Sequence, residues 1–169
     1  MSNRYKNIAL FIGYLFVFFS CESEFEVSTE GGAFDGYTVL APMNDEEVIV
    51  IDNAGDVLES VKTGLRPGVD VQLIPNGKIL GVFKVSKPSI DFGGYGGIVR
   101  IFDFQGNVEW QYTISSDDEM VHHDAEYLPN GNVLLTIWER KSREEANQRG
   151  LSIEEDVYVD YIIEIDPAQ

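Results

Sequence analysis

The sequence predicts an all-β protein of the β-propeller class, built from four-stranded antiparallel blades. Two segments that begin 54 residues apart, at Asp70 and Asp124, repeat one another as DVQLIPNGKILGVFK and DAEYLPNGNVLLTIW. A second pair, IDNAGDVLES from Ile51 and FDFQGNVEWQ from Phe102, precedes them. No regular helix pattern lies between the repeats. A strand-rich repeat of roughly 50 residues is typical of a propeller blade.

Each half of the repeat is predicted to be a β-hairpin. Pro-Asn-Gly, at residues 75–77 and 129–131, lies between alternating strands and can supply the positive φ angles of a tight two-residue turn. Asp-x-x-Gly, at Asp103 to Gly106, predicts a type I turn followed by a left-handed residue. Two hairpins per repeat give a four-stranded sheet. The sequence is therefore expected to hold about two blades and, at residues 165–167, the opening of a third.

The expected strands follow the chain in order. The series begins with residues 37–40, 48–51, 57–61, 69–74 and 78–85, and the last of these ends the second hairpin of the first blade. The second blade is expected to begin at residues 98–104, to continue through residues 108–114 and to reach His122. Between the two blades, the glycine-rich stretch DFGGYGG at residues 91–97 lacks the Gly-Lys-Ser/Thr ending of a P-loop, and no helix pattern follows it. This stretch is predicted to be a loop between blades that binds no nucleotide.

An insertion follows Trp138 in the second repeat. Ser142, with Glu145 three residues later, has the spacing of a capping box, and Gly150 can end a helix. We therefore expect a short, polar surface helix over residues 143–149, within a helical insertion near 142–150.

Residues 1–20 are predicted to be a signal peptide of the lipoprotein type. Arg4 and Lys6 precede an apolar run at residues 8–19, which is shorter than the ~20 residues that a membrane span needs. Cys21, the only cysteine, follows this run and is the predicted lipidation site. A cleaved secretory signal and an uncleaved anchor are the alternatives. We expect an exported protein, anchored by lipid at the envelope of a Gram-negative bacterium, on the periplasmic side or at the cell surface.

Residues 21–35 are acidic and contain glycine, which predicts a flexible tether before a partial propeller at residues 36–169. The chain has 12 Lys and Arg against 29 Asp and Glu, for a net charge of −17. This charge argues against nucleic acid and anionic membrane surfaces as partners, so a membrane contact is expected only through the lipid anchor. A single cysteine allows no internal disulfide.

The two histidines of the chain, His122 and His123, occupy a position that differs between the repeats. Gly-Val stands there in the first copy, and both copies continue with aspartate, at Asp70 and Asp124. The shared aspartate is predicted to be structural, because it can tie the start of a strand to backbone donors. The imidazole pair is a candidate site added to one repeat. Strand alternation predicts that the two rings point to opposite sides and that one of them faces the central channel.

A series of motifs runs through most of the chain. In order they are GYTVLAPMNDEEVIVIDNAGDVLES, the RPG of residues 66–68, LIPNG, VRIFDFQGNVEWQY, HHDAEYLPNGNVLL, WERKSREEANQRG and DYIIEIDP. Over roughly residues 36–167 this series resembles the N-terminal part of the arylsulfotransferase (aryl-sulfate sulfotransferase) family. The resemblance implies a complete propeller of about six blades. It also implies transfer of a sulfuryl group from a phenolic sulfate ester to a phenolic acceptor, through a transient sulfohistidine and without nucleotide, metal or other cofactor.

The same resemblance implies roles for the residues of the HHD motif. His123, which directly precedes the aspartate, is expected to face the channel and to donate to the sulfuryl oxygens. His122 is its substitute in this role, and Asp124 is expected to orient the ring. The main nucleophilic histidine is expected beyond Gln169. We therefore expect an N-terminal fragment of the enzyme that cannot close its ring and is inactive on its own.

Three other interpretations stay open. The first is a non-catalytic lipoprotein propeller that binds a protein or a carbohydrate. The second is a quinoprotein, because Asp103-x-x-Gly106 with Trp110 resembles a tryptophan-docking repeat, although the Thr-Gly-Lys core of that repeat is missing. The third is a metal site, against which the divergence of adjacent strand residues argues. Its candidate ligands are Asp117, Asp118, Glu119, His122, His123 and Asp124.

Overall fold

The computed structural model describes residue 32 and residues 34–169 of the chain. The predicted signal peptide, the lipidation site Cys21 and most of the predicted tether lie outside these residues. Residues from Phe34 to Gln169 form one compact unit. Among the described residues, no helix has the length and apolar character needed to cross a membrane.

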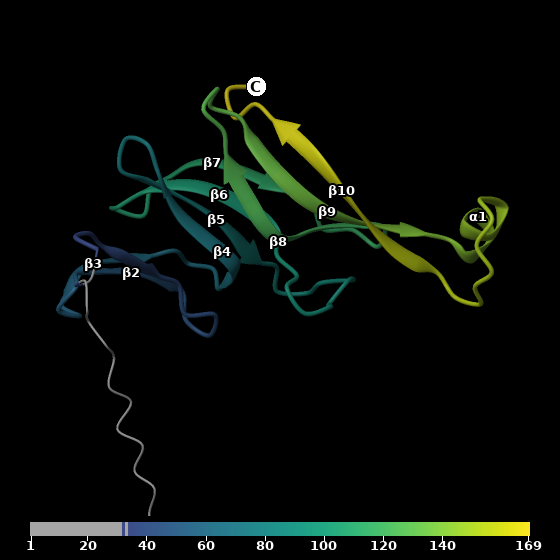
Figure 1. The fold of residues 1–169 in the computed structure, drawn as a ribbon, viewed down its shortest axis with the longest axis horizontal. Coiled ribbons are helices and arrows are strands. Elements are labelled where there is room, and N and C mark those ends of the chain that lie inside the picture. The colour runs from purple at the N-terminus through teal and green to yellow at the C-terminus, as the bar shows by residue number, and fades with distance from the viewer. Residues whose placement is uncertain (1–31, 33) are drawn as a thin grey trace, which may run out of the picture. The chain divides into compact units, whose positions relative to one another are not determined.

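Ten strands form three antiparallel sheets (Figure 1). The strands are β1 Thr38–Leu40, β2 Glu47–Ile51, β3 Val57–Lys62, β4 Pro67–Ile74, β5 Lys78–Lys84, β6 Gly97–Asp103, β7 Val108–Thr113, β8 Glu119–Tyr127, β9 Val133–Lys141 and β10 Val157–Ile165. Their orders are β1-β2-β3, β4-β5-β6-β7 and β10-β9-β8. The all-β prediction is confirmed, and within the described part of the chain the sheets do not close a ring.

The predicted grouping of the hairpins into blades is wrong by one hairpin. Strands β4 and β5 were assigned to the first blade, but they share a sheet with β6 and β7. Strand β5 pairs with β6 along its whole length, from Lys78 opposite Asp103 to Lys84 opposite Gly97. The glycine-rich stretch therefore lies within one sheet and not between two. Turn motifs mark hairpins, but they do not indicate which hairpin begins a sheet, and this explains the error.

The Pro-Asn-Gly turns are also longer than predicted. Ile74 pairs with Lys78, so three residues, and not two, form the turn. Asn76 and Gly77 both have positive φ, at 69° and 67°, whereas in the second copy only Gly131 does, at 90°. The motif gives a tight hairpin in both copies, but the backbone conformation of its asparagine differs.

The Asp-x-x-Gly turn has the predicted geometry. Oδ1 of Asp103 accepts hydrogen bonds from the backbone N–H groups two and four residues later, at 2.9 and 2.8 Å, and Gly106 has a φ of 83°. Asp52 makes the same two contacts at 2.8 and 2.9 Å. Asp166 accepts from the backbone N–H of Ala168 at 2.9 Å. The predicted third copy thus begins with the same side-chain contact.

The middle sheet is packed on both faces (Figure 1). Strand β5 is buried along nearly its whole length, and its side chains alternate between two hydrophobic clusters. The cluster toward the third sheet contains Ile74, Leu80, Val82, Val99, Ile101, Val121, Ala125, Val133, Leu135 and Ile137. The cluster toward the first sheet contains Val48, Val61, Ile79, Phe83 and Phe102. The three sheets therefore stack in chain order, and this stacking places β8 against the middle sheet.

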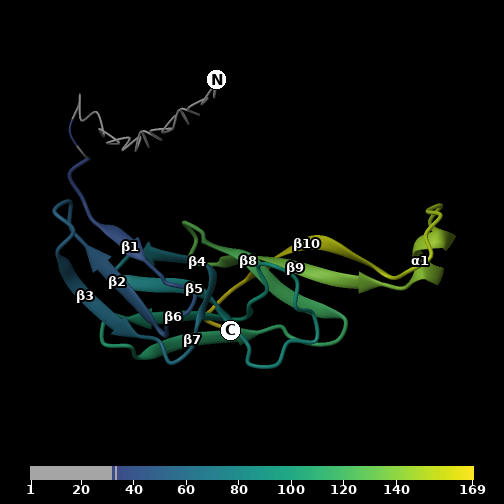
Figure 2. The ribbon, with the colours of Figure 1, turned by 90° about the horizontal axis from the view of Figure 1, so that it is seen from below.

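The predicted surface helix is present as α1, Arg143–Gln148, in the connection between β9 and β10 (Figure 2). The side chain of Ser142 caps it by accepting from the backbone N–H of Glu145 at 3.2 Å. Gly150 follows the helix with a φ of 95°. Local capping signals were enough to predict this element.

Candidate functional site

A wide irregularity in β8 carries the candidate residues. Val121 pairs with Ile137 and Ala125 pairs with Leu135, so the three residues 122–124 lie opposite the single residue Thr136 of β9. The hydroxyl of Thr136 donates to the carbonyl oxygen of His122. A bulge re-aims side chains that regular pairing would separate, and bulges are frequent beside functional sites.

The middle sheet contains the same irregularity 54 residues earlier. Pro67 pairs with Phe83 and Val71 pairs with Gly81, which leaves residues 68–70 opposite one residue of β5. The internal repeat is therefore preserved in backbone geometry as well as in sequence. One copy of the bulge carries Gly-Val-Asp and the other carries His-His-Asp.

The two imidazole rings meet, which contradicts the prediction that they point to opposite sides. His123 has a left-handed φ of 52°, unusual for a residue with a side chain. This backbone turn brings Nδ1 of His123 to 2.8 Å from Nδ1 of His122. The alternation rule fails here because it applies to regular strands, and residues 122–124 are bulged.

His122 is the buried member of the pair. Its ring stacks on Trp138, with ring centroids 4.1 Å apart and planes 7° from parallel. Its Nε2 lies 3.1 Å from Oδ1 of Asp160 on β10, and it has no hydrogen-bond partner in the described part of the chain. Burial lowers the pKa of His122, and the neighbouring His123 lowers it further, whereas Asp160 opposes both effects.

His123 is exposed and lies against the glycine-rich stretch. Its backbone N–H donates to the carbonyl oxygen of Gly94 at 2.9 Å, and the N–H of Gly96 donates to the carbonyl oxygen of Val121 at 3.1 Å. A Cβ added at Gly94 would overlap Cε1 and Nε2 of the His123 ring. This stretch was predicted to be a plain loop, but it forms one wall of the candidate site.

The shared aspartates differ in environment. Asp70 is half-buried, and burial raises its pKa, while Gln72 and the backbone of Ala125 act in the opposite direction. Gln72 also donates to the carbonyl oxygen of Ala125 and so joins β4 to β8. Asp124 is exposed. The contacts of Asp70 agree with the structural role that the repeat predicts.

Three aromatic rings lie beside the histidines. Phe92 makes edge contacts with Trp138, at 5.3 Å between centroids, and with Tyr158, at 4.7 Å. Trp138 also makes an edge contact with His123, at 5.8 Å. The site is thus an imidazole pair bordered by aromatic rings and glycine backbone.

The acidic residues before the histidines do not join the site. Asp118 is paired with Arg140, at 3.2 Å from its Nε. No three His, Cys, Asp or Glu side chains are grouped to hold a metal ion within residues 34–169. The alternative of a metal centre therefore has no geometric support in the described residues.

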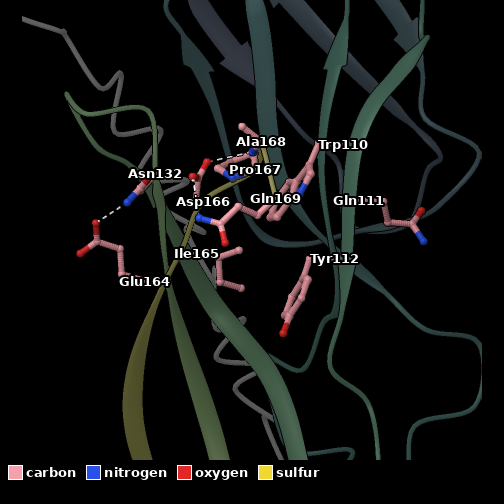
Figure 3. Close-up of a pocket in the computed structure, with 10 residues that line it drawn as sticks. All are labelled: Trp110, Gln111, Tyr112, Asn132, Glu164, Ile165, Asp166, Pro167, Ala168 and Gln169. Carbon is pink, nitrogen blue, oxygen red and sulfur yellow. Dashed lines mark hydrogen bonds between the residues drawn. The ribbon is translucent and has the colours of Figure 1, made fainter.

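A separate groove lies away from the histidines, between β7 and the end of β10 (Figure 3). Trp110 and Tyr112 point from β7 toward Ile165, while Gln111 points away. The rings of Trp110 and Tyr112 are parallel within 5°, with centroids 6.1 Å apart. Amide and carboxylate groups of Asn132, Glu164, Asp166 and Gln169 line the rest of the groove.

Sequence reasoning missed several residues of the histidine site. Asp160 reaches His122 because it pairs with Trp138 across the β9–β10 hairpin, and the insertion between these strands hides that register in the sequence. Thr136 could have been found as the residue opposite the HHD motif in the predicted hairpin. The glycines at residues 93–97 also indicate a place where another part of the chain can approach the backbone closely, but they predicted only a loop.

Comparison with known proteins gives one finding. The family model described as Arylsulfotransferase (ASST) matches residues 25–169. No curated protein and no solved structure gives a significant match. The matched residues include all three sheets and the histidine pair.

Proposed function

The chain belongs to the arylsulfotransferase family, and from this we propose that it takes part in transfer of a sulfuryl group from a phenolic sulfate ester to a phenol. The reaction has two steps, with a sulfohistidine between them. In the first step a nitrogen–sulfur bond forms and the ester oxygen–sulfur bond breaks, releasing the phenol. In the second step the acceptor oxygen takes the sulfuryl group from the histidine. Neither step needs a nucleotide.

In this proposal His123 supports the reaction and is not the nucleophile. Negative charge develops on the peripheral sulfuryl oxygens, and a positioned donor stabilises it. His123 is exposed, its backbone is held by Gly94, and His122 fixes the other side of its ring at 2.8 Å. A ring fixed in this way can meet a bound sulfate ester without being reoriented.

One observation supports this role more than any other. The same three-residue bulge occurs in β4 and β8, but only the second copy carries imidazole groups. The scaffold does not require histidine at this position, because the first copy forms the bulge with Gly68 and Val69. A chemical role is the simplest reason for the histidine pair in the second copy.

We also propose that the three sheets are consecutive blades of a propeller, with β4 and β8 as equivalent strands. The middle sheet has the four strands of a blade, and it packs against a neighbour on each face. In a ring of about six such blades, loops at one end of the channel would face the substrate. Export and anchoring through Cys21 are part of the proposal. Cys21→Ser is expected to move the protein from the membrane fraction to the soluble fraction.

The test of the transferase is an assay with phenyl sulfate as donor and a second phenol as acceptor. The coding sequence is first read past Gln169, so that any further histidine can be tested as the nucleophile. In the product of the whole gene, His123→Ala is expected to lower kcat by about 10²–10³-fold, as loss of one oxyanion donor does. Val69→Ala, at the equivalent position of the other bulge, is the matched control and should keep the rate.

A coding sequence with no later histidine, together with a product that transfers no sulfuryl group, would contradict the transferase. Equal activity of His123→Ala and the unchanged protein would instead contradict the supporting role of His123.

The groove in Figure 3 favours a second candidate, a propeller that binds carbohydrate. Stacked aromatic rings can cover the apolar face of a sugar, and the surrounding amides and carboxylates can bond its hydroxyls. Calorimetric titration with neutral oligosaccharides tests it. Trp110→Ala should abolish binding, and Gln111→Ala, whose side chain points away, should retain it. Absence of heat with the unchanged protein would exclude this candidate for the sugars used.

A further inference from the structure

The contact between the two histidines requires one proton and only one. Nδ1 of His122 and Nδ1 of His123 lie 2.8 Å apart, so one of them donates and the other accepts. Two bare nitrogens at this distance would repel each other, and two N–H groups would clash. When both rings are neutral, the tautomer of one therefore decides the tautomer of the other.

The surroundings of His122 decide which nitrogen carries the proton. Its Nε2 is buried, and Asp160 is the one charged partner near it in the described part of the chain. A bare Nε2 would need a hydrogen-bond donor, and a carboxylate is only an acceptor. An Nε2–H group can donate to Oδ1 of Asp160, which lies 3.1 Å away on an exposed side chain. Because a buried polar atom without a hydrogen-bond partner is destabilising, the Nε2–H form of His122 is favoured.

The tautomer of His122 fixes the tautomer of His123. With its proton on Nε2, neutral His122 has a bare Nδ1 and accepts the proton of Nδ1–H of His123. Neutral His123 then has a bare Nε2, and His123 is an exposed residue. We propose that Asp160 and His122 are positioning residues, which hold His123 in the Nδ1–H tautomer and present its Nε2 lone pair to a ligand.

In the reaction, this tautomer makes neutral His123 a proton acceptor, a role that rests on the proposed function. A bare Nε2 cannot donate, so neutral His123 accepts the proton of the incoming phenol. As the phenol oxygen bonds to sulfur and the nitrogen–sulfur bond of the sulfohistidine breaks, that proton moves to Nε2. The protonated ring is then the donor in the next turnover, when the leaving phenolate takes the proton back. The proton balance closes over the two steps.

The site contains the support that this arrangement needs. Trp138 stacks on the His122 ring and fixes its plane, and the hydroxyl of Thr136 holds the carbonyl oxygen of His122. Gly94 leaves room for the Nε2 edge of His123. Neither Gly94 nor Trp138 can take a proton, so they shape the pair without competing for it.

Nitrogen NMR of the full chain tests the tautomers directly and needs no activity. The chain has two histidines, so labelling with ¹⁵N-histidine gives four ring nitrogens. Long-range proton–nitrogen correlation, at a pH where both rings are neutral, shows which nitrogen carries each proton. We expect Nε2–H for His122 and Nδ1–H for His123. A proton on Nε2 of His123 would overturn the inference.

Substitution of the carboxylate tests the cause. Asp160→Ala is expected to change His123 from a single tautomer to a mixture of the two. Asp160→Asn keeps an acceptor oxygen, so we expect a smaller fraction of the second tautomer in this variant. Glu155→Ala, which also removes an exposed carboxylate near β10, should leave the spectrum unchanged. Dispersed amide spectra of each variant confirm folding. An unchanged tautomer in folded Asp160→Ala would contradict the role of Asp160.

The two proposals can fail separately. If NMR shows the expected tautomers but the enzyme transfers no sulfuryl group, the proposed function is refuted and the positioning role of Asp160 and His122 stands. If the enzyme transfers a sulfuryl group while neutral His123 carries its proton on Nε2, the positioning role is refuted and the proposed function stands. In an active enzyme, Asp160→Ala should lower kcat about 10-fold, as loss of a residue that orients a catalytic imidazole does, and should shift the pH profile of kcat/KM.

Discussion

Gly94 lies directly against the imidazole ring of His123, with no room for a side chain between them. The glycine has a φ of 92°, which residues with a Cβ rarely adopt, and its carbonyl oxygen accepts from the N–H of His123 at 2.9 Å. One residue of a loop that connects two strands of the middle sheet therefore sets the position of a side chain on the next sheet.

We expect Gly94→Ala to displace the His123 ring and to lower the free energy of unfolding by about 1–3 kcal/mol, because the substitution adds both overlap and backbone strain. Denaturant unfolding measures the stability, and the ring-proton shifts of His123 report its displacement. Gly93→Ala is the matched control, since no atom lies within 4 Å of the position its Cβ would take. Equal effects of the two substitutions would refute the claim that the contact is specific.

The hydroxyl of Thr136 is expected to stabilise the bulge. It donates to the carbonyl oxygen of His122, and it lies 3.4 Å from the carbonyl oxygen of Asp124. Thr136→Val keeps the shape of the side chain but leaves a partly buried acceptor without its donor, which should lower the free energy of unfolding by about 1 kcal/mol. Thr136→Ser retains the hydroxyl and should lose less. If serine and valine have the same effect, the bulge does not depend on this hydrogen bond.

The pKa of His122 is expected to lie below its ordinary value of 6.5. Burial is the main cause and the charge of His123 the smaller one, while Asp160 on β10 acts in the opposite direction. The unfolded chain takes up the proton more readily than the folded one. The contribution of His122 to stability is therefore full above pH 6.5 and is lost as the pH falls through its folded pKa.

Titration of the ring protons by NMR measures this pKa directly, without the background of other groups. Asp160→Ala should lower it further, because the substitution removes the one contact that favours the charged ring. Glu155→Ala should leave it unchanged. A pKa at or above 6.5 in the unchanged protein would mean that the ring is more hydrated than its burial implies.

Local signals were sufficient for most of the fold. The Asp103 turn, the Ser142 cap and the strands on either side of each Pro-Asn-Gly were predicted because each depends on a few neighbouring residues. The grouping of hairpins into sheets was not predictable in the same way. It depends on the pairing of β5 with β6 across the glycine-rich stretch, a contact that no turn motif encodes.

The candidate site was predicted in composition but not in geometry. The change from Gly-Val to His-His between the repeats identified the correct position. The meeting of His122 with His123 could not be predicted, because it requires a left-handed φ at His123 that the alternation rule excludes. Asp160 was missed because its register with Trp138 is set across a hairpin with a long insertion.

Asp70, the half-buried aspartate of the repeat, is expected to affect stability through its charge. Burial, with a further effect from the charge of Asp124, raises the pKa of Asp70, so the folded chain holds the proton of Asp70 more strongly than the unfolded chain does. The contribution of Asp70 to stability is therefore full below the unfolded pKa near 3.8 and is lost as the pH rises through its folded pKa. Burial partly desolvates the carboxyl of Asp70 and so penalises its charged form.

Asp70→Asn removes this charge and keeps the shape of the side chain, so we expect an unchanged or higher unfolding midpoint at pH 7 and a smaller advantage near pH 4. Thermal unfolding at the two pH values measures both. Asp117→Asn, at an exposed position, should show neither effect. Sulfuryl transfer should also persist in Asp70→Asn, because Asp70 joins β4 to β8 and does not lie in the bulge that carries the histidines. A folded Asp70→Asn protein that has lost transfer would instead make Asp70 part of the reaction.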